Sequence, residues 1–358
     1  MKKIILDARK VNDYGIGEYI QTLFPAIIKS DNFEYKVLIN DNSATGEKFF
    51  DKLPEAHVIE VKSHNYSFRE HNEIPNVVKG LDDFLYFSPH YIFPYFLKNK
   101  LIVTIHDLIH FKFPQYFKPG IKVGFAKRFI LKIKNSDTKV FTVSENSKKD
   151  LIEMFGFSDN SIKVIHNGIR EIFFRYKKGA NPKPFPYIMY TGNFKPHKNI
   201  DVMLNAFSIL SEKHPSLRLV LAGVEKSRQL TDITEKYKIR DRVFPSGFIP
   251  TEELINLLDF SEFFVFPSLY EGFGFPPLEA MARGKAVISS DRGSLSEVLG
   301  DAAVYFNPSS PEELSVKMDK LLTDHTFRNE HEERGRLHSN NYKTERMISE
   351  YLKEFSQI

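Results

Sequence analysis

Short runs of apolar residues alternate along the chain with segments in which apolar residues recur every three or four positions. Such short runs are typical of strands buried on both faces of a parallel sheet, and the recurring pattern is typical of helices that cover such a sheet. We therefore predict an α/β protein. The predicted strands are residues 2–8, 35–39, 58–61, 84–87, 101–105, 140–143, 162–165, 187–191, 217–222, 243–245, 263–267, 286–289 and 303–306.

Several predicted helices are also marked by residues suited to their ends. Ser144 and Gly156 bound a predicted helix over 145–155, and Thr251 is placed to cap a helix over 252–260. Another helix begins near Ile200, where apolar residues follow one face of a helix, and the last predicted helix covers 344–355.

Two series of alternating strands and helices are separated by residues 177–186, which contain three prolines and a glycine. Because such a segment cannot continue a helix or a central strand, we predict a linker there. The prediction is two doubly wound, Rossmann-like domains facing across a cleft, over residues 1–176 and 177–340. Residues 341–358 would form a C-terminal helix that packs back on the first domain.

Composition limits the function before any motif is considered. The chain has 358 residues, and its formal net charge of +4 is too small to indicate a nucleic-acid partner. It has no cysteine, which excludes disulfides, thiolate metal sites and a cysteine nucleophile and fits a cytoplasmic protein. The N-terminal apolar run is too short for a signal peptide, and no run approaches the roughly 20 apolar residues of a transmembrane helix.

The strongest chemical signal is the segment Glu271-Gly-Phe-Gly-Phe-Pro-Pro-Leu-Glu279, directly after a predicted strand. Gly272 and Gly274 let the backbone approach a ligand closely, and the two prolines suit the first turn of a helix. The N-terminus of that helix would attract an anion, while the two carboxylates accept sugar hydroxyls. The alternative is a tight strand–helix turn with a glutamate that complements the helix dipole.

A second segment, Thr191-Gly-Asn-Phe-Lys-Pro-His-Lys-Asn199, also lies between a predicted strand and a predicted helix. Lys195 and Lys198 bring positive charge to this helix start, which suits a diphosphate. The alternative is a solvated loop that carries lysines. Two phosphate-binding helix starts in one domain favour the first interpretation.

His106 ends a predicted strand, where ligands of parallel sheets bind, although a buried core histidine would have the same pattern. His90 has a similar placement, and it is interpreted either as part of the wall of the acceptor site or as a residue packed for structural reasons. Gly15 and Gly17 lack the third glycine of a dinucleotide fingerprint, because Ile20 stands there, so a dehydrogenase is excluded. No Asp-x-Asp pair or histidine cluster is present, and we expect no metal site.

Taken in order, these motifs resemble those of glycosyltransferase family four, or group 1, which includes bacterial lipopolysaccharide and lipid mannosyltransferases. The resemblance implies the two-domain GT-B fold, a nucleoside diphosphate sugar as donor, retention at the anomeric carbon and no cofactor. It covers nearly the whole chain, and the Glu271–Glu279 spacing is its most specific part. The matching segments are Gly15–Gly17, Thr104–Asp107, Val143–Ser147, Val164–Gly168, Gly192 with Lys198-Asn199, Leu219–Gly223, and Glu271 with Glu279.

The resemblance also implies roles for single residues. Lys198 would bind the donor diphosphate, Glu279 the ribose, and Glu271 with the backbone of 272–275 the donor sugar. His106 would lie near the reacting centre, and Gly15 and Gly17 where the first domain meets the donor. The implied catalytic residues are His106, Lys198 and Glu271, and the implied donor-binding residues are Gly15, Gly17, Gly192, Asn193, Lys198, Gly272, Phe273, Gly274, Phe275 and Glu279.

Two residues depart from the family pattern. Asn193 stands where many members have arginine, and His197 replaces the arginine of a Pro-Arg-Lys-Asn signature whose bearers favour GDP-mannose. These departures keep open a catalytically inactive subunit that binds nucleotide sugars. A nucleotide-sugar epimerase on the same fold is the other alternative, against which the Glu271–Glu279 spacing argues.

Residues 112–134 combine many lysines with Phe117, Ile121, Phe125 and Phe129, which are four positions apart. A basic amphipathic helix of this kind can lie on an anionic membrane. This interpretation predicts a peripheral enzyme at the inner face of the membrane with a lipid-linked acceptor. The alternative places the apolar side in the core and the lysines in water. The predicted acceptor is a glycan or a lipid-linked molecule.

Overall fold

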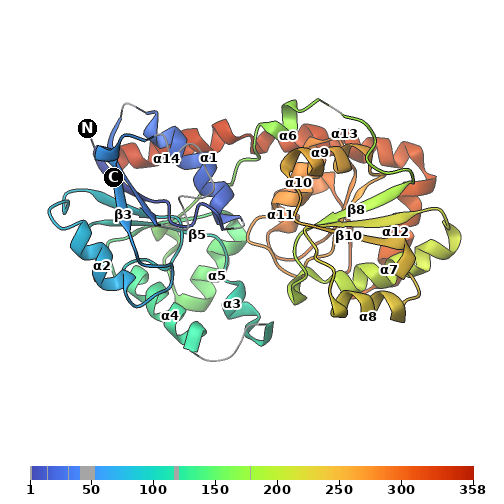
Figure 1. Cartoon of the computed structure of the whole chain (residues 1–358), viewed down its shortest axis with the longest axis horizontal. Helices are drawn as coiled ribbons and strands as arrows, with labels where there is room; N and C mark the ends of the chain where they lie inside the picture. Colours follow the sequence, from blue (N-terminus) through green and yellow to red (C-terminus); the bar gives the residue numbers. More distant parts are fainter. Residues whose placement is uncertain (1, 14, 31, 41–52, 117–120, 178) are drawn as a thin grey trace. The chain divides into compact units, whose positions relative to one another are not determined.

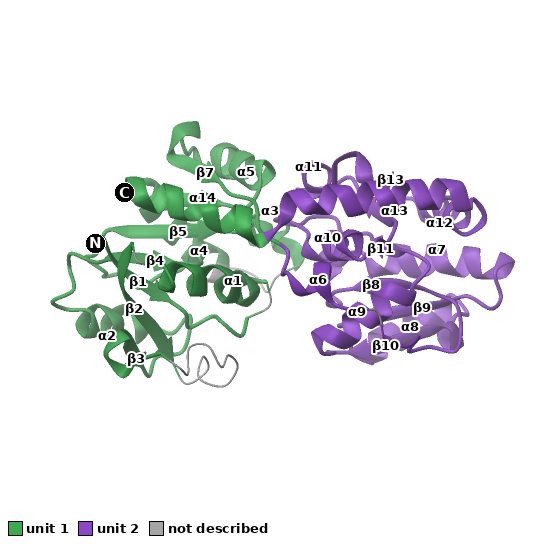
Figure 2. Cartoon of the chain, turned by 90° about the horizontal axis from the view of Figure 1, so that it is seen from above, with its two compact units in different colours: residues 1–168, 344–358 green, residues 169–343 purple. Residues whose placement is uncertain are grey.

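The computed structural model describes residues 2–13, 15–30, 32–40, 53–116, 121–177 and 179–358, without the side chains of residues 121 and 122. The chain forms two compact units, which Figure 2 distinguishes by colour. Unit 1 comprises residues 1–168 and 344–358, and unit 2 comprises residues 169–343. Each unit is built on a parallel sheet with helices packed on it, so the predicted α/β class is confirmed (Figure 1).

The sheet of unit 1 has the strand order β3-β2-β1-β4-β5-β6-β7, and all neighbouring strands are parallel. Its strands are β1 Lys2–Asp7, β2 Phe33–Asn40, β3 Val58–Val61, β4 Leu85–Ser88, β5 Leu101–Ile105, β6 Lys139–Thr142 and β7 Ile162–Val164. Its α-helices are α1 Ile16–Ile28, α2 Glu70–Val77, α3 Ile109–Lys112, α4 Ile121–Lys134, α5 Glu145–Phe155 and α14 Thr344–Gln357. Its 3-10 helices are η2 Glu55–His57, η3 Pro114–Tyr116 and η4 Asp159–Ser161.

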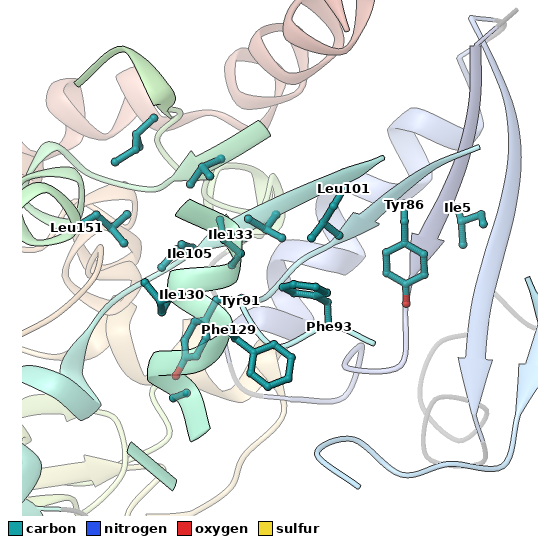
Figure 3. Packing of buried hydrophobic residues seen from close by; sticks show 14 of the residues in the cluster. Ile5, Tyr86, Tyr91, Phe93, Leu101, Ile105, Phe129, Ile130, Ile133 and Leu151 are labelled. Atoms are coloured by element: carbon teal, nitrogen blue, oxygen red, sulfur yellow. The ribbon is translucent and has the colours of Figure 1, made fainter. Parts of the chain in front are cut away.

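Side chains of the unit 1 strands alternate between two cores, one on each face of the sheet. Ile4 and Leu6 of β1 pack with α1 and with Tyr351 of α14, whereas Ile5 faces the core that α2, α4 and α5 cover. Figure 3 shows this second core, where Phe129, Ile130 and Ile133 of α4 lie against strand residues such as Leu101 and Ile105.

Residues 121–134 of the basic segment form α4, and the described part of this helix packs by its apolar side. Phe129 is buried in the core shown in Figure 3 and Phe125 is half-buried against it. Phe117 and residues 118–120 of the segment lie outside the described residues. The alternative, with the apolar side in the core, therefore holds for this part of the helix. Its exposed basic residues are Lys127, Arg128 and Lys134.

The sheet of unit 2 has the order β10-β9-β8-β11-β12-β13, again parallel throughout. Its strands are β8 Tyr187–Thr191, β9 Arg218–Ala222, β10 Val243–Gly247, β11 Phe264–Phe266, β12 Val287–Ser290 and β13 Val304–Phe306. Its α-helices are α6 Ile172–Arg175, α7 Ile200–Lys213, α8 Arg228–Lys236, α9 Thr251–Phe260, α10 Phe275–Ala282, α11 Leu295–Leu299, α12 Pro311–Thr323 and α13 His325–Ser339. Its 3-10 helices are η5 Pro196–Lys198, η6 Arg240–Arg242, η7 Gly300–Ala302 and η8 Asn340–Tyr342.

The boundary between the units lies eight residues before the predicted one, at 168/169 rather than 176/177. Ile169 donates its backbone N–H to the carbonyl of Tyr342 at 2.7 Å and forms a bridge with Lys343. The carbonyl of Phe173 accepts a hydrogen bond from Arg283 at 2.9 Å. These contacts tie residues 169–176 to unit 2, and α14 belongs to unit 1.

One predicted helix cap is confirmed and one is wrong. Ser144 accepts a hydrogen bond from the Ser147 N–H, and Gly156 ends α5 in the left-handed conformation. In contrast, α9 begins at Thr251 itself with Pro250 at its N-cap position. The Thr251 hydroxyl instead accepts a hydrogen bond from Arg170 at 3.2 Å. None of the described helices is long and apolar enough to cross a membrane.

Candidate active site

In unit 2, the carboxyl ends of β8 and β11 lie side by side in the sheet, where the strand order reverses direction. Such a switch point is where open parallel sheets bind ligands, because the two loops that leave it diverge. The loop after β8 contains residues 192–199, and the loop after β11 contains residues 267–274. Both predicted motifs of this half of the chain therefore start from one place in the fold.

Lys198 and Glu271 meet from these two loops. The Lys198 ammonium lies 2.6 Å from a carboxylate oxygen of Glu271, and both side chains are about 15% exposed. The ion pair is thus largely shielded yet reachable from solvent. Because nothing in the local sequence pairs positions 198 and 271, this contact is a result of the fold alone.

Asn199 fixes the two loops relative to each other. Its backbone is left-handed, with φ of 56°, between η5 and α7. Its side-chain amide donates to the carbonyl oxygens of Pro267 at 3.2 Å and Pro308 at 2.8 Å. A backbone hydrogen bond of 2.7 Å from Leu269 to His197 adds a second link. Sequence reasoning had placed Asn199 in the motif without giving it this role.

Gly192 is required by close packing at the end of β8. Its φ of 151° lies in the region that favours glycine, and an added β-carbon would lie 2.4 Å from the Tyr190 hydroxyl oxygen. The Tyr190 hydroxyl donates to the carbonyl of Asn193 at 3.3 Å. Burial, and then the nearby Glu271 carboxylate, raise the pKa of Tyr190 well above its ordinary value, so the hydroxyl keeps its proton.

Gly274 has the same kind of constraint at the start of α10. Its φ is 106°, and an added β-carbon would lie 2.8 Å from the side chain of Leu295. The two prolines after Phe275 have no N–H, so they remove two of the donors that a helix N-terminus normally offers. Binding of an anion here would therefore rely on the N–H groups of Phe275 and of residues 272–274, called the glycine loop below, and less on the first turn of the helix.

Ser294, which the sequence analysis did not single out, holds the glycine loop. Its hydroxyl lies 3.0 Å from the carbonyl oxygens of both Glu271 and Phe273. Gly293 packs so tightly here that an added β-carbon would lie 2.9 Å from the Glu271 nitrogen. With these carbonyls turned toward Ser294, the N–H groups of the same two peptide bonds point away from it, because the C=O and N–H of a trans peptide lie on opposite sides. No sequence signal distinguishes Ser294 from other polar residues after β12.

Other polar groups gather at the same strand ends. Thr191 Oγ1, Asn193 Oδ1 and Ser268 Oγ are buried without a hydrogen-bond partner among the residues that the structure describes. Buried oxygens of this kind are costly unless something hydrogen-bonds to them, so the site is suited to a polar ligand. Glu279 is buried on α10 at 5% exposure, about one turn after the helix begins at Phe275.

The remaining predicted residues lie in unit 1. His106 follows β5, and its ring nitrogen Nε2 is 2.9 Å from the carbonyl oxygen of Pro89. Because a carbonyl only accepts, Nε2 carries the proton and Nδ1 is the basic nitrogen. Burial, and more weakly the Lys10 ammonium, lower the pKa of His106 to about 4 despite the hydrogen bond to Pro89, so the ring is neutral at pH 7.

His90 follows β4 and is held by its own turn. Its Nδ1 accepts the Ile92 N–H at 3.0 Å, and the Ser88 hydroxyl donates to the His90 carbonyl at 2.7 Å. Burial, followed by the charges of Lys10, His106 and His110, lowers its pKa well below the ordinary value. His90 is thus packed as a neutral histidine beside the same strand ends as His106.

Gly15 and Gly17 have local structural reasons to be glycine. Gly15 is the N-cap of α1 with φ of 69°, and an added β-carbon at Gly17 would lie 2.3 Å from the carbonyl oxygen of Val11. The Gly17 N–H also donates to the Asp13 carbonyl at 2.7 Å. Backbone geometry alone therefore accounts for both glycines, and their implied contact with the donor stays a prediction.

Comparison with known proteins agrees with this arrangement. The profile of the glycosyl transferases of group 1 matches residues 172–343, and that of glycosyltransferase family 4 matches residues 53–171. The chain belongs to this glycosyltransferase family. Its fold is accordingly the GT-B fold predicted from the sequence. Among the described residues, no three His, Asp or Glu side chains cluster as a metal ion would require.

Named relatives of this glycosyltransferase include two mannosyltransferases of Escherichia coli. O-antigen chain mannosyltransferase B is 27% identical over 293 residues, which cover 78% of this chain and 76% of that protein. The serotype-specific mannosyltransferase WbdA is 28% identical over 244 residues, or 64% of this chain. The match spans only 30% of the length of WbdA.

Solved structures share the fold of this glycosyltransferase over its whole length. Sucrose-phosphate synthase from Thermosynechococcus elongatus has a TM-score of 0.80 at 17% identity, covering 100% of this chain and 99% of that one. HepE from Anabaena, in complex with UDP-glucose, has a TM-score of 0.78 at 16% identity and covers 100% of both chains.

Proposed function

We propose that this glycosyltransferase moves mannose from a nucleoside diphosphate donor to a glycan or lipid-linked acceptor, with retention at the anomeric carbon. The observation that carries the proposal is the contact between Lys198 and Glu271 beside the glycine loop at the switch point. An ammonium and a carboxylate held together there match the two halves of a sugar diphosphate. The names of the relatives support mannose as the sugar.

Donor binding would exchange one ion pair for two contacts. The Lys198 ammonium would leave Glu271 for the diphosphate, and the Glu271 carboxylate would then accept hydroxyls of the sugar. The amides of the glycine loop, which Ser294 orients, would contact the phosphate, and Glu279 would accept the ribose hydroxyls. Because negative charge grows on the leaving diphosphate, Lys198 would stabilise the transition state more than the ground state.

His106 of unit 1 is proposed to act on the reacting sugar. As a neutral ring with a basic Nδ1, it can accept a hydrogen bond from the donor sugar or the acceptor without adding positive charge. Retention requires no protein nucleophile if the leaving phosphate takes the acceptor proton on the same face. We assign no nucleophile for this reason.

Two measurements test the proposal. A thermal-shift screen of GDP-, UDP- and dTDP-sugars should give the largest stabilisation with GDP-mannose, because bound ligand stabilises the folded state. UDP-glucose is the competing donor, since HepE was crystallised with it. Labelled GDP-mannose supplied with mannosides should then yield a labelled disaccharide. Absence of both the shift and the product would overturn the proposal.

The inactive-subunit alternative rests on Asn193 and His197. The imidazole of His197 is buried, and the Asn193 carbonyl accepts from Tyr190, so both residues are built into the loop that carries Lys198. A stable complex with donor but no transferred sugar would favour this alternative. Substituting arginine at position 193 or 197 would then be expected to raise turnover.

We further propose catalysis without a metal ion or cofactor, because Lys198 and the loop amides supply positive charge where a cation would otherwise act. Transfer should then be unchanged by EDTA.

We also propose peripheral attachment at the inner membrane face through the exposed basic residues of α4. Sedimentation with anionic liposomes at low salt tests this attachment, and it should weaken as salt is added.

A further inference from the structure

Tyr66 in unit 1 has a backbone conformation that aromatic residues rarely adopt. Its φ is 66°, in the left-handed region, yet the side chain is 51% exposed and fills no core. For a bulky residue this conformation costs free energy, and it persists only where the surrounding structure enforces it. Packing stability does not explain a strained residue at the surface, so the position of the ring itself requires a reason.

A buried charge network enforces the conformation. The Tyr66 N–H donates to one carboxylate oxygen of Glu70 at 3.1 Å, and the other oxygen lies 2.6 Å from Arg9. Arg9 also binds Asp7 through two hydrogen bonds of 2.8 and 2.7 Å, and all three charged side chains are buried. The Asn65 amide donates to the Arg9 carbonyl at 3.1 Å. The loop that carries Tyr66 is thus fastened to the end of β1.

The ring lies over groups that follow the switch point of the unit 1 sheet, between β1 and β4. The Lys10 ammonium is 3.9 Å from the centre of the Tyr66 ring and donates to its hydroxyl. His90 meets the ring edge-on, with 5.9 Å between centroids. The Lys10 ammonium lies at the hydroxyl end of the ring, and half of the Tyr66 side chain is exposed, so the ring can be reached from solvent.

The chemistry of this place favours a neutral ligand with hydroxyl groups. The two cations, Arg9 and Lys10, are matched by Asp7, Glu70 and Asp13, the last of which lies 3.2 Å from the Lys10 ammonium. An anionic ligand therefore finds no net positive charge. The Asn65 Oδ1 is buried without a hydrogen-bond partner among the described residues and can accept a hydrogen bond from a hydroxyl group.

We propose that Tyr66, with Asn65 beside it, forms a subsite that binds a sugar ring of the acceptor. The electron-rich ring face would stack against the C–H face of a pyranose. Asn65 would accept a hydrogen bond from one hydroxyl of that sugar. Lys10 and the Arg9–Glu70 pair act as positioning residues. The inference rests on the proposed function, because the acceptor is taken to be a mannoside.

Saturation-transfer NMR with methyl α-mannopyranoside as the probe tests the subsite. We expect binding to wild-type protein and about tenfold weaker binding to Tyr66→Gly, the loss that follows from removing one stacked ring. Glycine adopts a positive φ without strain, so Tyr66→Gly should not lower the melting temperature. Phe68→Ala, which removes a more exposed ring two residues away, is the matched control and should bind like wild type.

The outcomes separate this proposal from the proposed function. Nucleotide-sugar binding, measured by thermal shift, should be equal in wild type and Tyr66→Gly, because Lys198, Glu271 and Glu279 lie in unit 2. Equal probe binding by wild type and Tyr66→Gly, equal loss in Phe68→Ala, or no probe binding by wild type would each overturn the subsite. Absence of both the nucleotide shift and the labelled product with wild-type protein would instead overturn the proposed function.

Discussion

At the scale of single residues, the site depends on charges whose surroundings are set by loops rather than by their neighbours in sequence. The Lys198–Glu271 pair is shielded but reachable, and its two members are 73 positions apart. An ion pair of this kind is a poor source of stability, because much of the attraction between its charges offsets their lost hydration. The pair instead keeps both charged groups in position, so that each can exchange its partner for a part of the bound ligand.

Lys198→Ala should lower donor affinity and turnover together. A hydrogen bond to a charged group contributes about 1.5–3 kcal/mol, so kcat/KM should fall roughly 10- to 100-fold. Lys213→Ala, at the far end of α7, is the control and should leave both parameters unchanged. Steady-state kinetics with varied donor measure the effect, and an unchanged KM would contradict a ground-state contact with the diphosphate.

Glu279→Gln should weaken the binding of GDP without any sugar attached, because the predicted contact is with the ribose. The neutral amide keeps the size of the side chain, and losing a charged acceptor should cost about 1.5–3 kcal/mol. Calorimetric titration with GDP and with UDP measures it. If both nucleotides bind Glu279→Gln like the wild type, the ribose assignment is wrong.

His106 should make stability depend on pH. Its pKa is about 4 when folded, against about 6.5 in an unfolded chain, so the unfolded state binds more protons between these values. The free energy of unfolding should therefore fall as pH drops from 6.5 to 4, by up to about 3 kcal/mol from this residue. His106→Gln keeps a donor toward Pro89 and should flatten the dependence, as urea titrations can show. His325→Gln, at an exposed position on α13, should not.

At the scale of elements, strands and helices were largely predictable and the contacts between loops were not. The bounds of β3, β5, β8 and α5 agree with the predicted ranges because apolar periodicity and caps are local properties. The Thr251 cap was wrong because a distant arginine binds its hydroxyl, and Ser294 was missed because only the folded chain brings it to Glu271. Local pattern does not contain such partners.

The two ends of α10 allow a comparison between two glycines with positive φ, Gly274 before the helix and Gly284 after it. Gly274→Ala meets both backbone strain and Leu295 at 2.8 Å, whereas Gly284→Ala, with φ of 69°, meets strain alone. We expect Gly284→Ala to cost about 1 kcal/mol of stability and Gly274→Ala at least twice that, with weaker donor binding in addition. Urea unfolding and donor titration of the two variants measure this difference. If both variants lose the same stability and donor binding is unchanged, the Leu295 side chain moves aside at little cost and the prediction is wrong.

At the scale of the whole molecule, the predicted linker misplaced the boundary because proline marks a surface loop and not the limit of a unit. Long-range pairing decides that limit, as when Ile169 binds Tyr342 and Lys343. After Lys343 the chain returns to unit 1 as α14, whose residues Tyr351 and Phe355 are completely buried there. The last helix of the chain thus completes the core of the first sheet.

Tyr351→Ala should destabilise unit 1 selectively. Removing a large buried aromatic side chain costs about 3–5 kcal/mol, and Tyr351 packs against Tyr19, Phe87 and Phe141. Scanning calorimetry should show a lower-melting transition for the variant, while GDP still stabilises unit 2. Ile348→Ala, on the half-buried side of α14, should cost less. A nucleotide shift lost in Tyr351→Ala would show that the units do not melt separately.

The return of α14 to unit 1 also sets the order in which a growing polypeptide can reach its native state. Residues 169–343 contain every strand of their own sheet, so they can fold as soon as they have left the ribosome. The amino-terminal sheet, although translated first, keeps part of one hydrophobic face uncovered until α14 has been synthesised, because α1 covers only the rest of that face. During translation, therefore, the half made earliest is finished last and is the half most exposed to chaperones.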